Sequence, residues 1–218
     1  AAFKRPDQLM ENIIGVTDYL GREIEKSGGD RTREALQVVR PRSGEPYFTD
    51  SQGGAWRLYP FVERTVCYQS AETPELFAAS GRAFGRFQKL LRDYPADTLY
   101  ETIPNFHNTE DRLAKFKAAV AADKLGRAAE CHSEIQFVLD RETDCSVALS
   151  AMREGRLPLR VTHNDTKLNN VLMDEKTGEG VCIIDLDTVM PGLVIYDFGD
   201  SIRFGANHCA EDETDLSK

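Results

Sequence analysis

The sequence predicts an α+β protein, because helical patterns and strand patterns occupy separate stretches of the chain. An amphipathic helix comes first, a short antiparallel meander follows it, and helices and a β-hairpin make up the remainder. With 218 residues and 41% apolar content, the chain can bury a core in one or two domains.

The first helix is expected at residues 6–26. Pro6 suits a first helical turn, and Gly28 and Gly29 end the pattern. The apolar residues at helical spacing are Leu9, Met10, Ile13, Ile14, Leu20 and Ile24. After this helix, we expect three strands, at residues 36–39, 47–49 and 56–62, joined by turns at 42–45 and 50–54.

A helical region is expected to follow the strands. Thr73 is a typical N-cap, and Pro74 stands at the first helical position after it. The apolar stripe of this helix consists of Leu76, Phe77, Phe84, Phe87, Leu90 and Leu91. Further helices are expected at residues 109–122 and 127–153, with a break near 140–144 in the second. The boundary between two domains is expected between strands and helices, which gives domains of residues 1–65 and 66–218.

The last part of the chain is again β-rich. An apolar run at residues 159–161 leads into the polar stretch 162–170, and a hairpin follows with strands at 171–173 and 181–184. The connecting residues 174–180 contain the Asp and Gly residues that favour a hairpin turn. Asp185 therefore stands at the end of the second strand.

The charge balance excludes one class of function. Asp and Glu number 36 against 27 Lys and Arg, a formal net charge of −9. A nucleic-acid groove needs a basic stripe, so we expect no nucleic-acid partner.

The five cysteines form neither a C-x-x-C pair nor a metal-ligand pattern with histidine. We expect reduced thiols at Cys67, Cys131, Cys145, Cys182 and Cys209. No signal peptide and no apolar run of membrane-spanning length is found in this sequence, which favours a cytoplasmic protein without a membrane partner.

The polar stretch carries the residues that phosphoryl transfer requires. His163, Asp165 and Asn170 fit the spacing H-x-D-x-x-x-x-N, and Asp185 follows after the hairpin. A carboxylate such as Asp165 can orient an acceptor hydroxyl and accept its proton. Asn170 and Asp185 offer the hard oxygen ligands that Mg²⁺ prefers. Lys167 offers a positive charge for the transferred phosphate, so the motif predicts a magnesium-dependent kinase that uses ATP.

The motif resembles the aminoglycoside phosphotransferase and choline kinase superfamily. The similarity lies in the run HNDTKLNNVL at residues 163–172 and in IIDLD at residues 183–187. The words around Asn164 and the run DLDTVMPG at residues 185–192 are most similar to the N-acetylhexosamine 1-kinase branch. This resemblance implies a bilobed, protein-kinase-like fold with ATP and Mg²⁺ as cofactors. Residues 1–65 would form part of an N-terminal lobe, and residues 66–218 a mostly helical C-terminal lobe.

The resemblance also implies roles for single residues. His163 would support the catalytic loop, and Asp197 would brace it, although Asp197, Phe198 and Gly199 spell the protein-kinase metal motif. We assign the metal to Asp185 instead, because Asp185 follows the hairpin directly. The hinge that binds adenine through its backbone would include Tyr59, Phe61 and Val62. Further candidates are Glu11, as partner of a strand lysine, and Thr188 and Arg203, facing a sugar acceptor.

The resemblance leads us to expect a fragment. A nucleotide-covering loop with a strand lysine would precede the first helix of such a kinase, and further helices would follow Asp200; neither is found in this chain.

Other functions stay open at this point. The acceptor could be choline, homoserine, a methylthio-sugar or an aminoglycoside instead of an N-acetylhexosamine. A nucleotide-binding pseudoenzyme is an alternative from another class, and the sequence leaves the oligomeric state open. A protein kinase is disfavoured, because no A-P-E element follows a long activation segment.

Overall fold

The computed structural model describes residues 4–207 and 214, so Cys209 lies outside the described residues. By compactness the chain divides into two units, one formed by residues 1–102 and 160–218 and the other by residues 103–159. Every residue of the predicted kinase motif belongs to the first unit. The predicted division into an N-terminal and a C-terminal lobe at residue 65 differs from this division into compact units, and it stays a prediction.

The first unit begins with the helix α1, Pro6–Lys26, which confirms the predicted helix at both ends. Its inner face buries Ile13, Val16 and Ile24 almost completely, and each such side chain contributes about 1.5–3 kcal/mol by leaving water. Gly28 has a positive φ of 78°, which permits Gly29 to donate its N–H to the Ile24 carbonyl at 2.9 Å and end the helix. The short helix α2, Arg31–Glu34, was not predicted.

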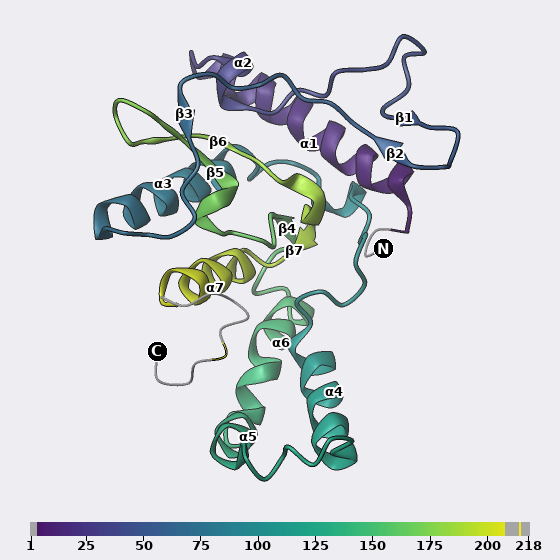
Figure 1. The fold of residues 1–218 in the computed structure, drawn as a ribbon, viewed down its shortest axis with the longest axis vertical. Coiled ribbons are helices and arrows are strands. Elements are labelled where there is room, and N and C mark those ends of the chain that lie inside the picture. The colour runs from purple at the N-terminus through teal and green to yellow at the C-terminus, as the bar shows by residue number, and fades with distance from the viewer. Residues whose placement is uncertain (1–3, 208–213, 215–218) are drawn as a thin grey trace. The chain divides into compact units, whose positions relative to one another are not determined.

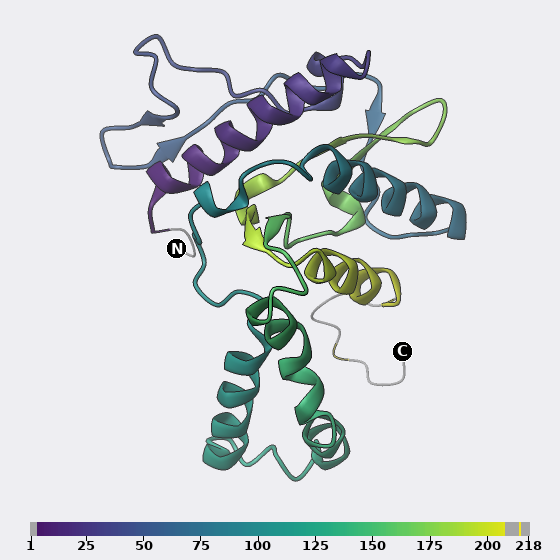
Figure 2. The same ribbon diagram turned by 180° about the vertical axis from the view of Figure 1, so that it is seen from behind.

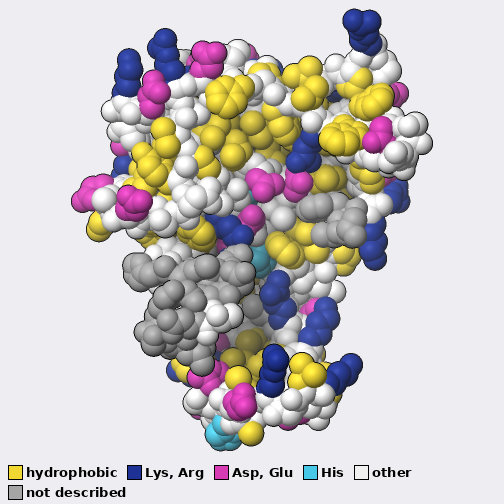
Figure 3. Space-filling model, in the orientation of Figure 1, with side chains coloured by type: hydrophobic (Ala, Val, Ile, Leu, Met, Phe, Trp, Pro, Cys, Tyr) yellow, Lys and Arg dark blue, Asp and Glu magenta, His cyan; other side chains and the backbone are white. Residues whose placement is uncertain are grey.

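The predicted meander is shorter than expected. Strand β1, Phe48–Thr49, pairs antiparallel with β2, Ala55–Trp56. The predicted strands at 36–39 and 56–62 were wrong in extent, because beyond β2 only a single bridge joins Val39 to Leu58. Pro41 and Pro60 lack the N–H that would continue the ladder. The exposed apolar side chains of this segment contribute to the yellow area in the upper half of Figure 3.

Helix α3, Pro74–Leu90, begins as predicted, with the Thr73 hydroxyl accepting a hydrogen bond from the Leu76 N–H at 3.2 Å. The helix packs on the hairpin formed by β5, Val171–Asp174, and β6, Gly180–Ile183. Packing is close, because a Cβ at Gly180 would lie 2.5 Å from the Ala83 Cβ. An unpredicted strand, β3 (Thr65–Val66), pairs with β5 and completes a three-stranded antiparallel sheet.

A second small sheet is formed by the strand that precedes the motif and a strand that follows it. Strand β4, Arg160–Thr162, pairs antiparallel with β7, Met190–Gly192. Helix α7, Val194–Gly205, follows β7 and packs against β4. Figures 1 and 2 show the green hairpin between the purple α1 above and the yellow α7 below. Three 3₁₀ turns of this unit are η1 (Ala96–Thr98), η3 (Leu168–Asn170) and η4 (Leu186–Thr188). Helices and small antiparallel sheets thus coexist, which confirms the α+β class.

The second unit is helical. Its elements are α4 (Thr109–Ala122), α5 (His132–Leu139), η2 (Glu142–Ser146) and α6 (Val147–Arg153). The predicted helix at 127–153 therefore begins five residues late and is interrupted by η2, near the expected break. Arg153 joins α6 to α4 through a bidentate ion pair with Glu110, whose shortest distance is 2.7 Å. No helix among the described residues is both long and apolar enough to span a bilayer.

Candidate active site

The loop between β4 and β5 is fixed by a buried histidine. His163 is fully buried, and its ring meets Phe84 and Phe87 of α3 edge-on at 5.4 and 6.0 Å between ring centres. Its Nδ1 accepts a hydrogen bond from the Asp165 N–H at 3.3 Å, and its Nε2 lies 2.9 Å from the Ile184 carbonyl oxygen. Both contacts fit a neutral ring protonated at Nε2. The histidine therefore holds the loop to the end of β6.

Two carboxylates of α7 accept hydrogen bonds from backbone N–H groups of the same loop. Asp197 accepts the N–H groups of His163 and Asn164 at 3.0 and 2.8 Å. Asp200, one helical turn later, accepts the Thr166 N–H at 2.7 Å. Burial raises the pKa of Asp197, whereas the donated hydrogen bonds lower it and favour the carboxylate. Since α7 presents both acceptors on one face, the helix fixes the backbone of the loop at His163, Asn164 and Thr166.

Asp165 and Asn170 are joined directly by their side chains. The Asn170 Nδ2 donates to the Asp165 carboxylate at 3.0 Å and to the Asp165 carbonyl at 2.8 Å. Lys167 lies beside them, with its Nζ 3.5 Å from the Asp165 Oδ1. The side chains of Asp165 and Lys167 keep 27% and 24% of their surface exposed, so both remain accessible to a ligand.

Asp185 stands where the hairpin ends, beside Asn170. The Ile184 N–H donates to the Asn170 carbonyl at 2.9 Å, which makes Asn170 and Asp185 neighbours across the strand end. The backbone of Asp185 is left-handed, with φ 55° and ψ 60°, a region that few residues other than Gly, Asn and Asp adopt. Partial burial raises the pKa of Asp185, and the negative charges of Asp187 and Asp165 raise it further. Both Asp187 and Asp165 therefore lie within electrostatic range of Asp185.

This donor set fits a divalent cation bound together with phosphates. Among the described residues, no hydrogen-bond donor is recorded for the Asp185 carboxylate or for the Asn170 Oδ1. The Asp185 carboxylate and the Asn170 Oδ1 are the kind of hard oxygen donors that a bound Mg²⁺ would use. Within the described part of the chain, no three His, Cys, Asp or Glu side chains form a metal site by themselves.

The remaining predicted residues lie around this centre or away from it. Thr188 donates its hydroxyl to the His163 carbonyl at 2.6 Å, and Arg203 contacts the Asp200 carboxylate at 3.0 and 3.1 Å. Glu11 is exposed on α1. In the hinge candidate, Phe61 is 85% exposed and Val62 is buried.

Three residues near the loop, Arg57, Asp187 and Asp200, were not singled out by sequence reasoning. Arg57 forms an ion pair with Asp187, and its guanidinium lies 5.4 Å from the centre of the Tyr59 ring. The third is Asp200. The spacing of Asp197 and Asp200, three residues apart in a helix, would have put both on one face, had the helix been recognised. No local signal indicates Arg57, because its partner lies 130 residues later in the chain.

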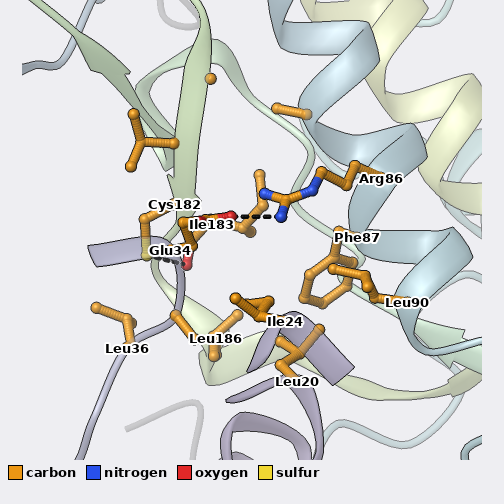
Figure 4. A pocket seen from close by; sticks show the side chains of 14 residues that line it. Leu20, Ile24, Glu34, Leu36, Arg86, Phe87, Leu90, Cys182, Ile183 and Leu186 are labelled. Atoms are coloured by element: carbon orange, nitrogen blue, oxygen red, sulfur yellow. Dashed lines mark hydrogen bonds and ion pairs between the residues drawn. The ribbon is translucent and has the colours of Figure 1, made fainter. Parts of the chain in front are cut away.

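A small cavity lies behind the strand end that carries Asp185. Figure 4 shows Ile183 and Leu186 on its wall, together with Cys182 and the ion pair of Glu34 with Arg86. Its volume of about 30 Å³ is that of one water molecule, which excludes a substrate. Burial raises the pKa of Cys182 to about 12, so this thiol stays protonated.

We expect the Asp185→Asn variant to be more stable than the wild type without metal at pH 8. A raised pKa means that the folded protein holds this proton more tightly than the unfolded chain, so the charged carboxylate destabilises the fold above that pKa. The gain should be modest, because Asp185 is exposed to water, and should vanish as the pH falls towards about 4. Thermal unfolding in EDTA at both pH values measures it. A lower Tm than wild type at pH 8 would contradict the electrostatic account of this site.

One comparison bears on this geometry. The family model described as the phosphotransferase enzyme family (APH) matches residues 29–215, which include the whole second unit, most of the first, and the loop from His163 to Asp185. The match covers most of the chain, and membership of this family supports an enzyme that is a kinase. The chain therefore belongs to the phosphotransferase enzyme family.

Proposed function

We propose that the protein transfers the γ-phosphate of ATP to a hydroxyl group of a small molecule. The observation that carries the proposal is the double link of Asn170: its side chain holds Asp165, and its backbone holds the strand end before Asp185. A proton acceptor and two metal oxygens thereby stand together at one end of the hairpin. Family membership supports the same activity.

Each residue has a distinct part in the proposed reaction. Asp165 accepts a hydrogen bond from the acceptor hydroxyl, orients it and takes its proton during transfer. Lys167 supplies a positive charge beside the incoming phosphate. Asn170 and Asp185 would hold Mg²⁺, which supplies neutralisation of the phosphate oxygens. His163, Asp197 and the other loop contacts fix these groups before substrate arrives, so little reorganisation is needed.

We propose an N-acetylhexosamine as acceptor, phosphorylated at its anomeric hydroxyl. Support for this comes from the run at residues 185–192, which resembles the N-acetylhexosamine 1-kinase branch. Thr188 lies in this run. Its hydroxyl is engaged by the loop, so its contribution to acceptor binding would be the position of the turn rather than a direct hydrogen bond.

The test is an acceptor panel incubated with ATP and Mg²⁺. Product is detected by mass spectrometry for N-acetylhexosamines, choline, homoserine, a methylthio-sugar and aminoglycosides, each with an EDTA control. A sugar 1-phosphate, formed with magnesium and absent in EDTA, is the expected result. Product from another acceptor would contradict only the sugar assignment. Magnesium-dependent ATP binding without product from any acceptor would instead favour a nucleotide-binding pseudoenzyme.

A further inference from the structure

Arg57 and Asp187 join two distant segments at the edge of the proposed metal site. Arg57 directly follows β2, and Asp187 is the middle residue of the η4 turn. Both side chains are mostly buried, with 24% and 25% of their surface exposed. Water screens an ion pair with this degree of burial less than one on an open surface, so the attraction is stronger and its geometry is fixed.

The η4 turn is the segment that sets the position of Asp185. It begins immediately after Asp185, whose left-handed backbone is unfavourable for a residue with a side chain and persists only if its surroundings hold it. One side of the turn is held by Leu186, which is buried, and its end is held by Thr188 through the His163 carbonyl. Asp187, between them, is held by the ion pair with Arg57. The turn is therefore anchored at each of its three residues.

The ion pair also places a positive charge beside the Asp187 carboxylate, two residues after Asp185. The aromatic ring of Tyr59 limits the orientation of the guanidinium, which lies over it. Without Arg57, Asp187 would lose its partner and its charge would push against the carboxylate two residues before it.

We propose that Arg57 is a positioning residue for the metal site, acting through Asp187 on the turn that presents Asp185. Arg57 itself contacts neither the metal nor the acceptor. This inference rests on the proposed function, since it needs a magnesium-bound nucleotide at Asp185. Residues that orient a metal ligand without touching the metal typically change metal affinity by about 10- to 100-fold.

The test is nucleotide binding as a function of magnesium concentration, which requires no turnover. A non-hydrolysable ATP analogue is titrated into the protein by calorimetry at a series of Mg²⁺ concentrations. We expect Arg57→Gln to raise the Mg²⁺ concentration for half-maximal binding by about tenfold. The KM for the acceptor should stay within about twofold of wild type, and the variant pair Arg57→Gln and Asp187→Asn together should be no worse than the more severe single change.

Arg33 provides the matched control. It forms an ion pair with Asp174 at 2.7 Å, with side-chain exposures of 29% and 24%, and joins α2 to the hairpin turn, away from Asp185. Arg33→Gln should lower the Tm without changing the magnesium dependence. The inference is overturned if Arg57→Gln shifts the magnesium midpoint no more than Arg33→Gln does. If the wild type binds the nucleotide analogue with no dependence on magnesium, that result contradicts the proposed function itself. It then also overturns this inference, which rests on that function.

Discussion

Replacing Asp165 with Asn should reduce product formation by about a thousandfold, within the range typical of a lost general base. The amide has the shape of the carboxylate and can still accept the Asn170 Nδ2 hydrogen bond, but it cannot take a proton from the acceptor. The fold should be little affected, because Asp165 is partly exposed and its ion pair with Lys167 is long, at 3.5 Å. Initial rates with ATP, Mg²⁺ and the acceptor identified by the panel measure the effect.

A conservative change elsewhere controls for handling and concentration. Asp93 is an exposed aspartate with 74% of its side-chain surface in water, and Asp93→Asn should retain the wild-type rate. Nucleotide binding by Asp165→Asn should also match the wild type, since the proposed role of Asp165 is toward the acceptor. A rate for Asp165→Asn within twofold of wild type would remove this residue from the mechanism.

Replacing Asp197 with Ala should lower the free energy of unfolding by about 2–5 kcal/mol. The wild-type carboxylate accepts the N–H groups of His163 and Asn164 and also a hydrogen bond from Gln88. All three donors would lose their acceptor, and the two backbone groups are buried. Each buried donor without a partner costs about 1–3 kcal/mol. Urea denaturation, with the m-value compared between proteins, measures the loss.

The stability loss should be accompanied by a loss of catalysis in the remaining folded protein, because the same hydrogen bonds position the loop before Asp165. Asp93→Ala again serves as the control and should stay within about 0.5 kcal/mol of wild type. An unfolding free energy of Asp197→Ala that equals this control would show that α7 does not clamp the loop.

Local signals were sufficient to predict the two longest helices and the hairpin of the fold. Pro6 and the glycines after Lys26 define α1, and Thr73 and Pro74 define the start of α3. Both hairpin strands lie within one residue of their predicted bounds. Short strands were not predictable in this way. A strand of two or three residues such as β3 or β7 has no measurable periodicity, and its existence depends on a partner far along the chain.

The candidate site was predictable where its residues share one motif. His163, Asp165 and Asn170 have a fixed spacing, and the structure joins each of them to its neighbours by hydrogen bonds. Asp200 could not be identified, because the helical nature of α7 was not recognised. Arg57 could not be identified either, because its importance depends on a contact across the fold and not on its neighbours in sequence.

The convergence of Asn170 and Asp185 on one magnesium-bound nucleotide is tested most directly by a thermodynamic cycle. Calorimetric titration of a non-hydrolysable ATP analogue, with Mg²⁺ and with EDTA, gives the magnesium-dependent part of the binding free energy for each protein. The wild type should bind more tightly with Mg²⁺, and Asn170→Ala and Asp185→Asn should each remove most of that difference. Combining the two changes should add little, because both would hold the same ion. Magnesium-dependent binding that survives both substitutions, or losses that add in full, would contradict a shared site at the end of the hairpin.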